Sequence, residues 1–195
     1  VDCPAGDAHA AVCTLCGHGC PDGQVKWDGR CHSCGAGRFS PPGCTKEQPD
    51  CDACPPGRFT ASGASTGCGA CDPGTFSDQR GATGCLPCSP GRVAESAGLA
   101  VCSSCPAGKH ALDPGSSACT SCIPGRAGSG SGACATCPVG RFAGTAGAST
   151  CSLCPAGTYQ TTPGQSWFAD RACTACPLGR WSSAPGASSV DRCQA

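Results

Sequence analysis

Large apolar side chains are sparse in this chain, and they return at one position of a short repeat. Each repeat contains a Cys-x-x-Cys pair, and positions are numbered here from the second cysteine of that pair. Position +5 is commonly aromatic, and the residues found there are Phe39, Phe59, Phe76, Val93, His110, Ala127, Phe142, Tyr159 and Trp181. We expect one ring per unit, lying on the disulfide of that unit, to be the whole core of the unit.

Glycines mark two turns in each repeat. Position +3 is glycine in every unit from Cys34 onward, and proline often precedes it, as in Pro55-Pro56-Gly57. Proline followed by glycine is typical of a type II turn. A second glycine, such as Gly63 or Gly81, falls four or five residues before the next pair and predicts a return turn. Each unit is therefore predicted to be a short irregular hairpin closed by its cysteines.

The cysteine pairs return every seventeen residues from Cys51 to Cys122, with one shorter and one longer step afterwards. A fixed period predicts a linear repeat array. The 195 residues include 24 cysteines, a density typical of secreted disulfide scaffolds. A unit this small lies far below the roughly 40 residues under which chains need disulfides or metals to fold. The predicted fold is small and disulfide-rich: an elongated rod of tandem hairpin modules with little regular secondary structure and only short β pairs.

The array is predicted to cover residues 51–195 as about eight repeats, after an irregular cysteine-rich cap at residues 1–50. Two pairing schemes are open. In the favoured scheme the second cysteine of each pair closes onto the first cysteine of the next pair; in the rival, crossed scheme Cys51 joins Cys68 and Cys54 joins Cys71. The favoured pairs are Cys54–Cys68, Cys71–Cys85, Cys88–Cys102, Cys105–Cys119, Cys122–Cys134, Cys137–Cys151, Cys154–Cys173 and Cys176–Cys193.

In the cap, the cysteine spacing suggests the interleaved pairs Cys31–Cys44 and Cys34–Cys51. The remaining cysteines of the cap would then pair among themselves, and they are Cys3, Cys13, Cys16 and Cys20. In the chain-entropy model, closing a loop of about 15 residues is worth roughly 3 kcal/mol. We therefore expect the cross-links to dominate the stability of the whole chain.

Three segments carry a resemblance to a known family. They are Cys54-Pro-Pro-Gly-Arg-Phe, Cys137-Pro-Val-Gly-Arg-Phe and Cys154-Pro-Ala-Gly-Thr-Tyr. Each resembles the ephrin-receptor-like cysteine-rich repeat and the first sub-module of tumour-necrosis-factor-receptor repeats, both in the growth-factor-receptor cysteine-rich group. The spacing at residues 31–51 is similar to the second sub-module of those receptors. The resemblance covers nearly all of residues 31–195 and implies an extracellular rod of disulfide-linked modules.

Charge and motifs argue against several other functions. Thirteen basic and thirteen acidic residues balance, so nothing points to nucleic acid or to an anionic membrane surface. No apolar run approaches the roughly 20 residues of a membrane span. Single cysteines such as Cys3 and Cys193 have no place in a tiling of zinc-binding pairs, and we expect no metal, cofactor or catalytic residue. Since the chain lacks Asn, any glycan must be O-linked on Ser, Thr or modified Pro.

Position +4 is usually basic, and the residues are Arg38, Arg58, Arg92, Lys109, Arg126, Arg141 and Arg180. They are interpreted either as a stripe that binds an anionic glycan or acidic protein, or as solvated side chains that shield the hairpins. The second interpretation is favoured because the net charge is zero.

We predict an extracellular or cell-surface scaffold or stalk without enzymatic activity, part of a matrix or fibrous assembly. The alternative is the ligand-binding ectodomain of a receptor. The lengthened loop between Cys154 and Cys173 carries Trp167, Phe168 and Arg171, which are predicted to bind a protein partner or another copy of the chain. Otherwise Trp167 would fold back onto its own disulfide or onto Trp181.

Overall fold

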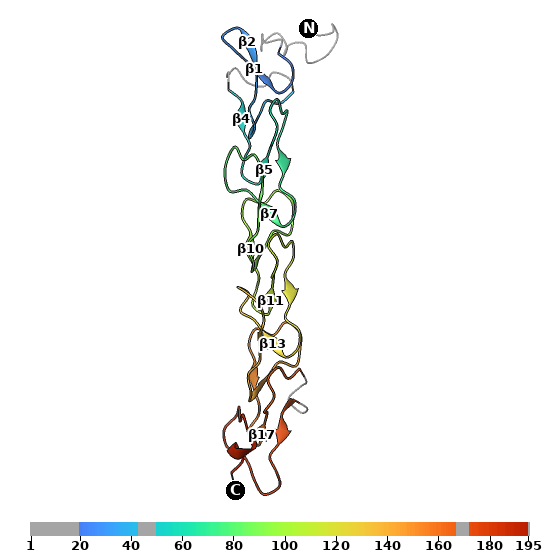
Figure 1. Cartoon of the computed structure of the whole chain (residues 1–195), viewed down its shortest axis with the longest axis vertical. Helices are drawn as coiled ribbons and strands as arrows, with labels where there is room; N and C mark the ends of the chain where they lie inside the picture. Colours follow the sequence, from blue (N-terminus) through green and yellow to red (C-terminus); the bar gives the residue numbers. More distant parts are fainter. Residues whose placement is uncertain (1–19, 43–49, 167–171, 195) are drawn as a thin grey trace, which may run out of the picture. The chain divides into compact units, whose positions relative to one another are not determined.

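The computed structural model describes residues 20–42, 50–166 and 172–194. The chain forms two compact units, one comprising Val1–Pro87 and Ala94–Cys102, the other comprising Cys88–Val93 and Ser103–Ala195. Each unit consists mainly of disulfide-closed hairpins such as those labelled β5 and β17 in Figure 1. Little helix occurs among the described residues; one short 3-10 helix is η1 (Val190–Arg192). The predicted small disulfide-rich fold is confirmed.

In the described part of both units, each strand pairs antiparallel with a strand next to it in the chain. The first unit has β1 (Gln24–Trp27) with β2 (Arg30–Ser33), β3 (Arg38–Phe39) with β4 (Asp52–Ala53), β5 (Arg58–Phe59) with β6 (Gly69–Ala70), and β7 (Thr75–Phe76) with β8 (Leu86–Pro87). The second unit has β9 (Arg92–Val93) with β10 (Ser103–Ser104), β11 (Lys109–His110) with β12 (Thr120–Ser121), β13 (Arg126–Ala127) with β14 (Ala135–Thr136), β15 (Arg141–Phe142) with β16 (Ser152–Leu153), and β17 (Thr158–Tyr159) with β18 (Thr174–Ala175). Apart from β1 and β2, the hairpins pair positions +4 and +5 with the two residues inside the next cysteine pair.

The turn that opens each hairpin has the geometry that the Pro-Gly sequences predict. The Arg58 N–H donates to the Pro55 carbonyl oxygen at 3.1 Å, and Gly57, third in the turn, has a φ of +82°. Glycine adopts this left-handed conformation without the steric conflict that a Cβ would cause. The return turn follows the prediction at Gly81. In the module closed by Cys54–Cys68, however, Ala64 takes the positive φ rather than the predicted Gly63.

The disulfides follow the favoured loop-closing scheme. The bonds are Cys34–Cys51, Cys54–Cys68, Cys71–Cys85, Cys105–Cys119, Cys122–Cys134, Cys137–Cys151, Cys154–Cys173 and Cys176–Cys193. Cys88 and Cys102 are disulfide-bonded as well. The crossed scheme is wrong, because Cys51 bonds to Cys34 rather than to Cys68. Each loop therefore closes on itself, and the covalent connection from one module to the next is the two residues inside a cysteine pair.

The predicted pair Cys31–Cys44 is wrong, because Cys31 bonds to Cys20. The reason is the hairpin of β1 and β2, whose tip residues Asp28 and Gly29 both have positive φ, +50° and +82°. A tight turn with two such residues allows β1 and β2 to pair directly on either side of it. The hairpin thereby brings Cys31, eleven residues after Cys20, back to that cysteine. The loop closed by Cys34–Cys51, in which β3 pairs with β4, has the same geometry as the repeats, although it lies before residue 51, the predicted start of the array. Cys3, Cys13, Cys16 and Cys44 lie outside the described residues.

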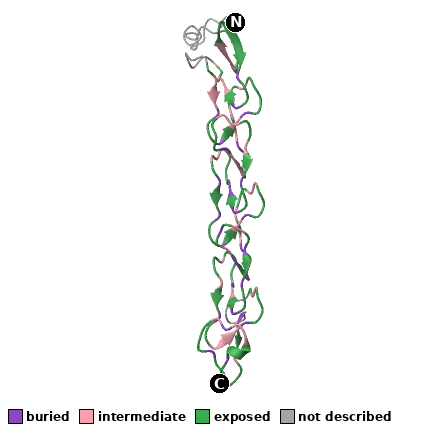
Figure 2. Cartoon of the chain, turned by 60° about the vertical axis from the view of Figure 1, so that its left-hand side comes forward, coloured by how far each residue is buried: buried purple, intermediate pink, exposed green. Residues whose placement is uncertain are grey.

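The buried residues are mainly cysteines and small side chains, drawn in purple in Figure 2. The second cysteine of a pair has no exposed surface at Cys54, Cys71, Cys137 and Cys154. Position +6 is also buried in most modules, where it holds Thr60, Ser77, Ala94, Ala111, Ala143, Gln160 and Ser182. The rings at +5 are less buried than expected. The expectation that one ring forms the whole core of its unit is therefore wrong.

Candidate functional site: the junction between successive modules

The side chain at position +5 crosses the junction to the next module. Val93 packs against Ala111 and against Cys105 and Cys119, which form the disulfide of the following module. Phe142 likewise packs against Cys154 and Cys173 of its successor. The +5 residue therefore covers the next disulfide instead of its own. Burial of that apolar surface favours the stacked arrangement of neighbouring modules.

Backbone hydrogen bonds form the second part of the junction. Between the modules closed by Cys54–Cys68 and Cys71–Cys85, the Gly57 N–H donates to Ser77 at 2.7 Å, and the Thr60 N–H donates to Ala82 at 3.2 Å. In the opposite direction, the Gly81 N–H donates to the carbonyl of Cys54 at 2.8 Å. These bonds satisfy backbone groups that the short hairpins leave unpaired.

The same three bonds recur in the second unit. Between the modules closed by Cys122–Cys134 and Cys137–Cys151, they run from Gly125 to Ala143, from Gly128 to Ala148 and from Gly147 to Cys122, at 2.8, 3.1 and 2.8 Å. In these two junctions positions +3, +6 and the return turn contribute backbone atoms alone, so these junctions do not depend on particular side-chain chemistry. Small side chains at +6 let the backbones approach.

A third contact reaches the module after next. A Cβ on Gly57 would overlap the carbonyl oxygen of Gly98, and a Cβ on Gly108 would overlap that of Gly147. In both cases the first-turn glycine of one module faces the return-turn glycine two modules further on. Glycine at +3 is therefore needed twice, for its positive φ and for this close approach.

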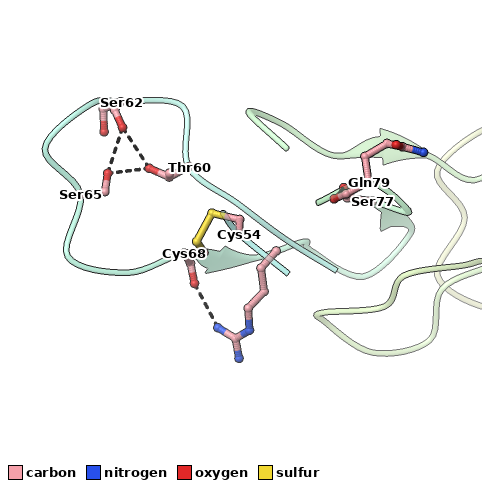
Figure 3. Close-up of a disulfide and its surroundings, with 8 residues drawn as sticks. Cys54, Thr60, Ser62, Ser65, Cys68, Ser77 and Gln79 are labelled. Atoms are coloured by element: carbon pink, nitrogen blue, oxygen red, sulfur yellow. Dashed lines mark hydrogen bonds between the residues drawn. A yellow bond between two sulfur atoms is a disulfide. The ribbon is translucent and has the colours of Figure 1, made fainter. Parts of the chain in front are cut away.

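Four of the basic side chains at +4 bond to their own modules. The Arg58 Nη1 donates to the carbonyl oxygen of Cys68 at 3.0 Å, next to the disulfide with Cys54 (Figure 3). Arg38, Arg126 and Arg141 make the equivalent bond to Cys51, Cys134 and Cys151 at 2.9, 3.3 and 3.1 Å. These four guanidinium groups cap the carbonyl of the cysteine that closes the loop, which agrees with the interpretation that they shield the hairpins.

Polar residues at +6 are accommodated by local hydrogen bonds. The buried Thr60 hydroxyl lies 2.6 Å from the Ser65 Oγ and 3.2 Å from the Ser62 carbonyl oxygen (Figure 3). Gln160 is the only long side chain in this column; its Oε1 accepts a bond from the Gly140 N–H at 2.9 Å. Its buried Nε2 has no hydrogen-bond partner among the described residues. The loop that follows Gln160 is the longest in the array.

One cluster has the composition of a metal site. The ligand atoms of His110, Cys122 and Cys134 lie within 4.8 Å of one another, and the His110 Nδ1 is 3.1 Å from the Cys134 Sγ. The two cysteines are bonded to each other, however, and a disulfide sulfur offers no thiolate to a metal. His110 occupies the +5 position and lies against the disulfide of the next module, as Val93 lies against Cys105–Cys119.

The predicted partner residues Trp167, Phe168 and Arg171 lie outside the described residues. Sequence reasoning missed position +6, although its signal was present: when the repeats are aligned on their cysteines, this column holds Ala, Gly, Ser or Thr in all but one module. The core was assigned instead to the aromatic residues at +5, because buried aromatic rings usually dominate cores.

The geometry defines a tandem array of disulfide-closed hairpin modules. Residues 126–170 and 144–193 match the family model described as tyrosine-protein kinase ephrin type A/B receptor-like. This match confirms the resemblance for residues 126–193. A comparison with curated proteins gave no match.

Dense disulfides and repeats of this type are typical of an extracellular or cell-surface domain, and such repeats are typically non-catalytic. The described residues contain no helix long and apolar enough to cross a membrane.

Proposed function

We propose that the chain is a non-enzymatic scaffold or stalk of a cell-surface or matrix assembly. One observation carries the proposal: modules in both units use the same backbone junction, and their +3, +6 and return-turn positions serve the neighbouring module. A surface that is repeated in this way fits a spacer, whereas a binding protein needs a site that differs from its surroundings. Repeat arrays of this kind also tolerate changes in the number of modules, because each module contacts only near neighbours.

The experiment is the removal of one period, residues 105–121, from the full-length protein in its native cell. A scaffold keeps its place in the insoluble surface or matrix fraction after this deletion, because the new junction joins equivalent positions. A control deletion of residues 105–113 breaks the period and should abolish secretion. The proposal would be contradicted if the protein lacking residues 105–121 were secreted with correct disulfides but failed to assemble.

The second candidate is a receptor ectodomain, and it is favoured by the loop between Cys154 and Cys173. These cysteines are nineteen residues apart, against fourteen in the standard modules. Under this proposal Trp167, Phe168 and Arg171 bind a protein partner. A Trp167→Ala/Phe168→Ala variant that is secreted and correctly bonded but loses a saturable ligand favours the receptor. Unchanged assembly of the same variant favours the scaffold.

A further inference from the structure

The disulfide between Cys122 and Cys134 has polar groups beside one of its sulfurs. The His110 Nδ1 lies 3.1 Å from the Cys134 Sγ, and the Arg126 Nη1 donates to the Cys134 carbonyl oxygen at 3.3 Å. In the preceding module the residue at +5 is Val93, which offers its disulfide no polar atom. Histidine and arginine beside a cysteine stabilise its thiolate form. Cys134 is therefore the better leaving group of the two cysteines.

The other sulfur, that of Cys122, lacks the side chain that covers its equivalent in the preceding module. There Ala111 at +6 packs in one cluster with Cys105. In the module closed by Cys122 and Cys134, position +6 is Gly128, and a Cβ at this glycine would stand 3.0 Å from the Cys122 Sγ. Because the methyl group is missing, only the Gly128 backbone lies over this side of the sulfur.

The loop between these two cysteines is held less firmly than its neighbours. Glycine occupies every second position of residues 128–132, and glycine loses the most conformational freedom on folding. In the next module the return-turn N–H of Gly147 donates to the Cys122 carbonyl, but no backbone N–H among the described residues donates to the equivalent carbonyl of Cys105. Local opening of this loop therefore costs less free energy, and it uncovers Cys122, which is completely buried in the closed module.

We propose that Cys122–Cys134 is a thiol–disulfide exchange site for a low-molecular-weight thiol. The incoming thiolate attacks the Cys122 Sγ and forms a new S–S bond there, while the bond between Cys122 and Cys134 breaks. The electron pair stays on the Cys134 Sγ, which accepts a hydrogen bond from His110 in the tautomer that carries a proton on Nδ1. The incoming sulfur is oxidised as that of Cys134 is reduced, so no further oxidant takes part. A better leaving group departs faster, which selects Cys122 as the sulfur attacked.

The test treats the fully oxidised chain with reduced glutathione, stops the reaction with acid, alkylates the free thiols and maps the products by mass spectrometry. Two results are expected. The glutathione adduct at Cys122 appears about tenfold faster than adducts of the neighbouring disulfides Cys105–Cys119 and Cys137–Cys151, and it exceeds the adduct at Cys134 by about fivefold or more. The same molecules carry an alkylated Cys134, because this cysteine is the leaving group.

Variants at position 110 separate the chemical role of His110 from simple packing. His110→Phe should bring the adducts at Cys122 and Cys134 close to equal amounts, whereas a packing role would change attack at both sulfurs alike. His110→Val, which copies Val93, replaces this variant if the phenylalanine protein does not form its disulfides. Lys109→Met, which removes a neighbouring charge, is the control and should keep the preference for Cys122. Equal exchange of the three disulfides in the parent protein, or an unchanged preference in the position-110 variants, overturns the proposal.

Discussion

Among the repeat positions, glycine at +3 is the one where adding a methyl group should lower the stability of the array most. Gly108 offers the sharpest test. Its φ is +85°, its N–H donates to Gly128 at 2.7 Å, and a Cβ would overlap the carbonyl of Gly147. Gly157 is a matched control: its φ is +80° and its N–H donates to Ser182, but no described atom lies within 4 Å of a Cβ.

The two alanine variants share one penalty and differ in another. The left-handed conformation costs a residue with a Cβ about 1–2 kcal/mol in either variant. In Gly108→Ala the overlap must also be relieved by moving the Gly147 turn away, which weakens the bonds from Gly108 to Gly128 and from Gly147 to Cys122. At about 1 kcal/mol for each bond, the expected loss is about 3–4 kcal/mol for Gly108→Ala and 1–2 kcal/mol for Gly157→Ala.

The assay is amide hydrogen exchange of the fully oxidised protein, which reports the opening free energy of each module separately. The difference of about 2 kcal/mol corresponds to roughly thirtyfold faster exchange of the amide at position 108 in Gly108→Ala than of the amide at position 157 in Gly157→Ala, each relative to the parent protein. Equal acceleration in the two variants would refute the reasoning, because it would mean that modules two apart separate at no cost.

Three further predictions follow from the junctions and the cross-links. Phe142→Ala should speed reduction of Cys154–Cys173 but not of Cys137–Cys151, as measured by mass spectrometry under limiting dithiol. The control Leu153→Ala should leave both rates unchanged. Faster reduction of Cys137–Cys151 alone would show that the ring covers its own disulfide. Arg58→Met removes a hydrogen bond to the Cys68 carbonyl and should lower the free energy of unfolding, measured in urea, by about 1 kcal/mol or less. Lys109→Met is the control. An equal loss in both variants would show that the effect comes from the lost charge. Full reduction without denaturant should abolish the cooperative thermal transition, since the buried residues are mostly the cysteines themselves, and a transition that survives would reveal a core independent of them.

Short-range features of the fold were predictable from the sequence because they depend on residues close together in the chain. The Pro55-Pro56-Gly57 turn and the loop closed by Cys54 and Cys68 both follow from local spacing. The partner of Cys31 was predicted wrongly because the prediction used the spacing of the cysteines and not the Asp28-Gly29 turn, which brings Cys31 to Cys20.

The junctions were harder to predict, because no local pattern says which module a side chain will touch. Phe142 was expected on its own disulfide, and only the register between modules places it on Cys154–Cys173. Small residues such as Ala111 carry no chemistry that suggests a role, so their importance became visible only from their burial.

The self-closing disulfides have a mechanical consequence. Tension along the chain passes through the bond between Cys54 and Cys68, whose Cα atoms are 5.7 Å apart, and bypasses the loop between them. Adding the three residue steps from Cys68 to Cys71 at about 3.3–3.6 Å each, an oxidised module can extend to only about 16 Å. The same seventeen residues could reach roughly 60 Å after reduction. Each module is thus a nearly inextensible link, and its disulfide sets how far the chain can be pulled.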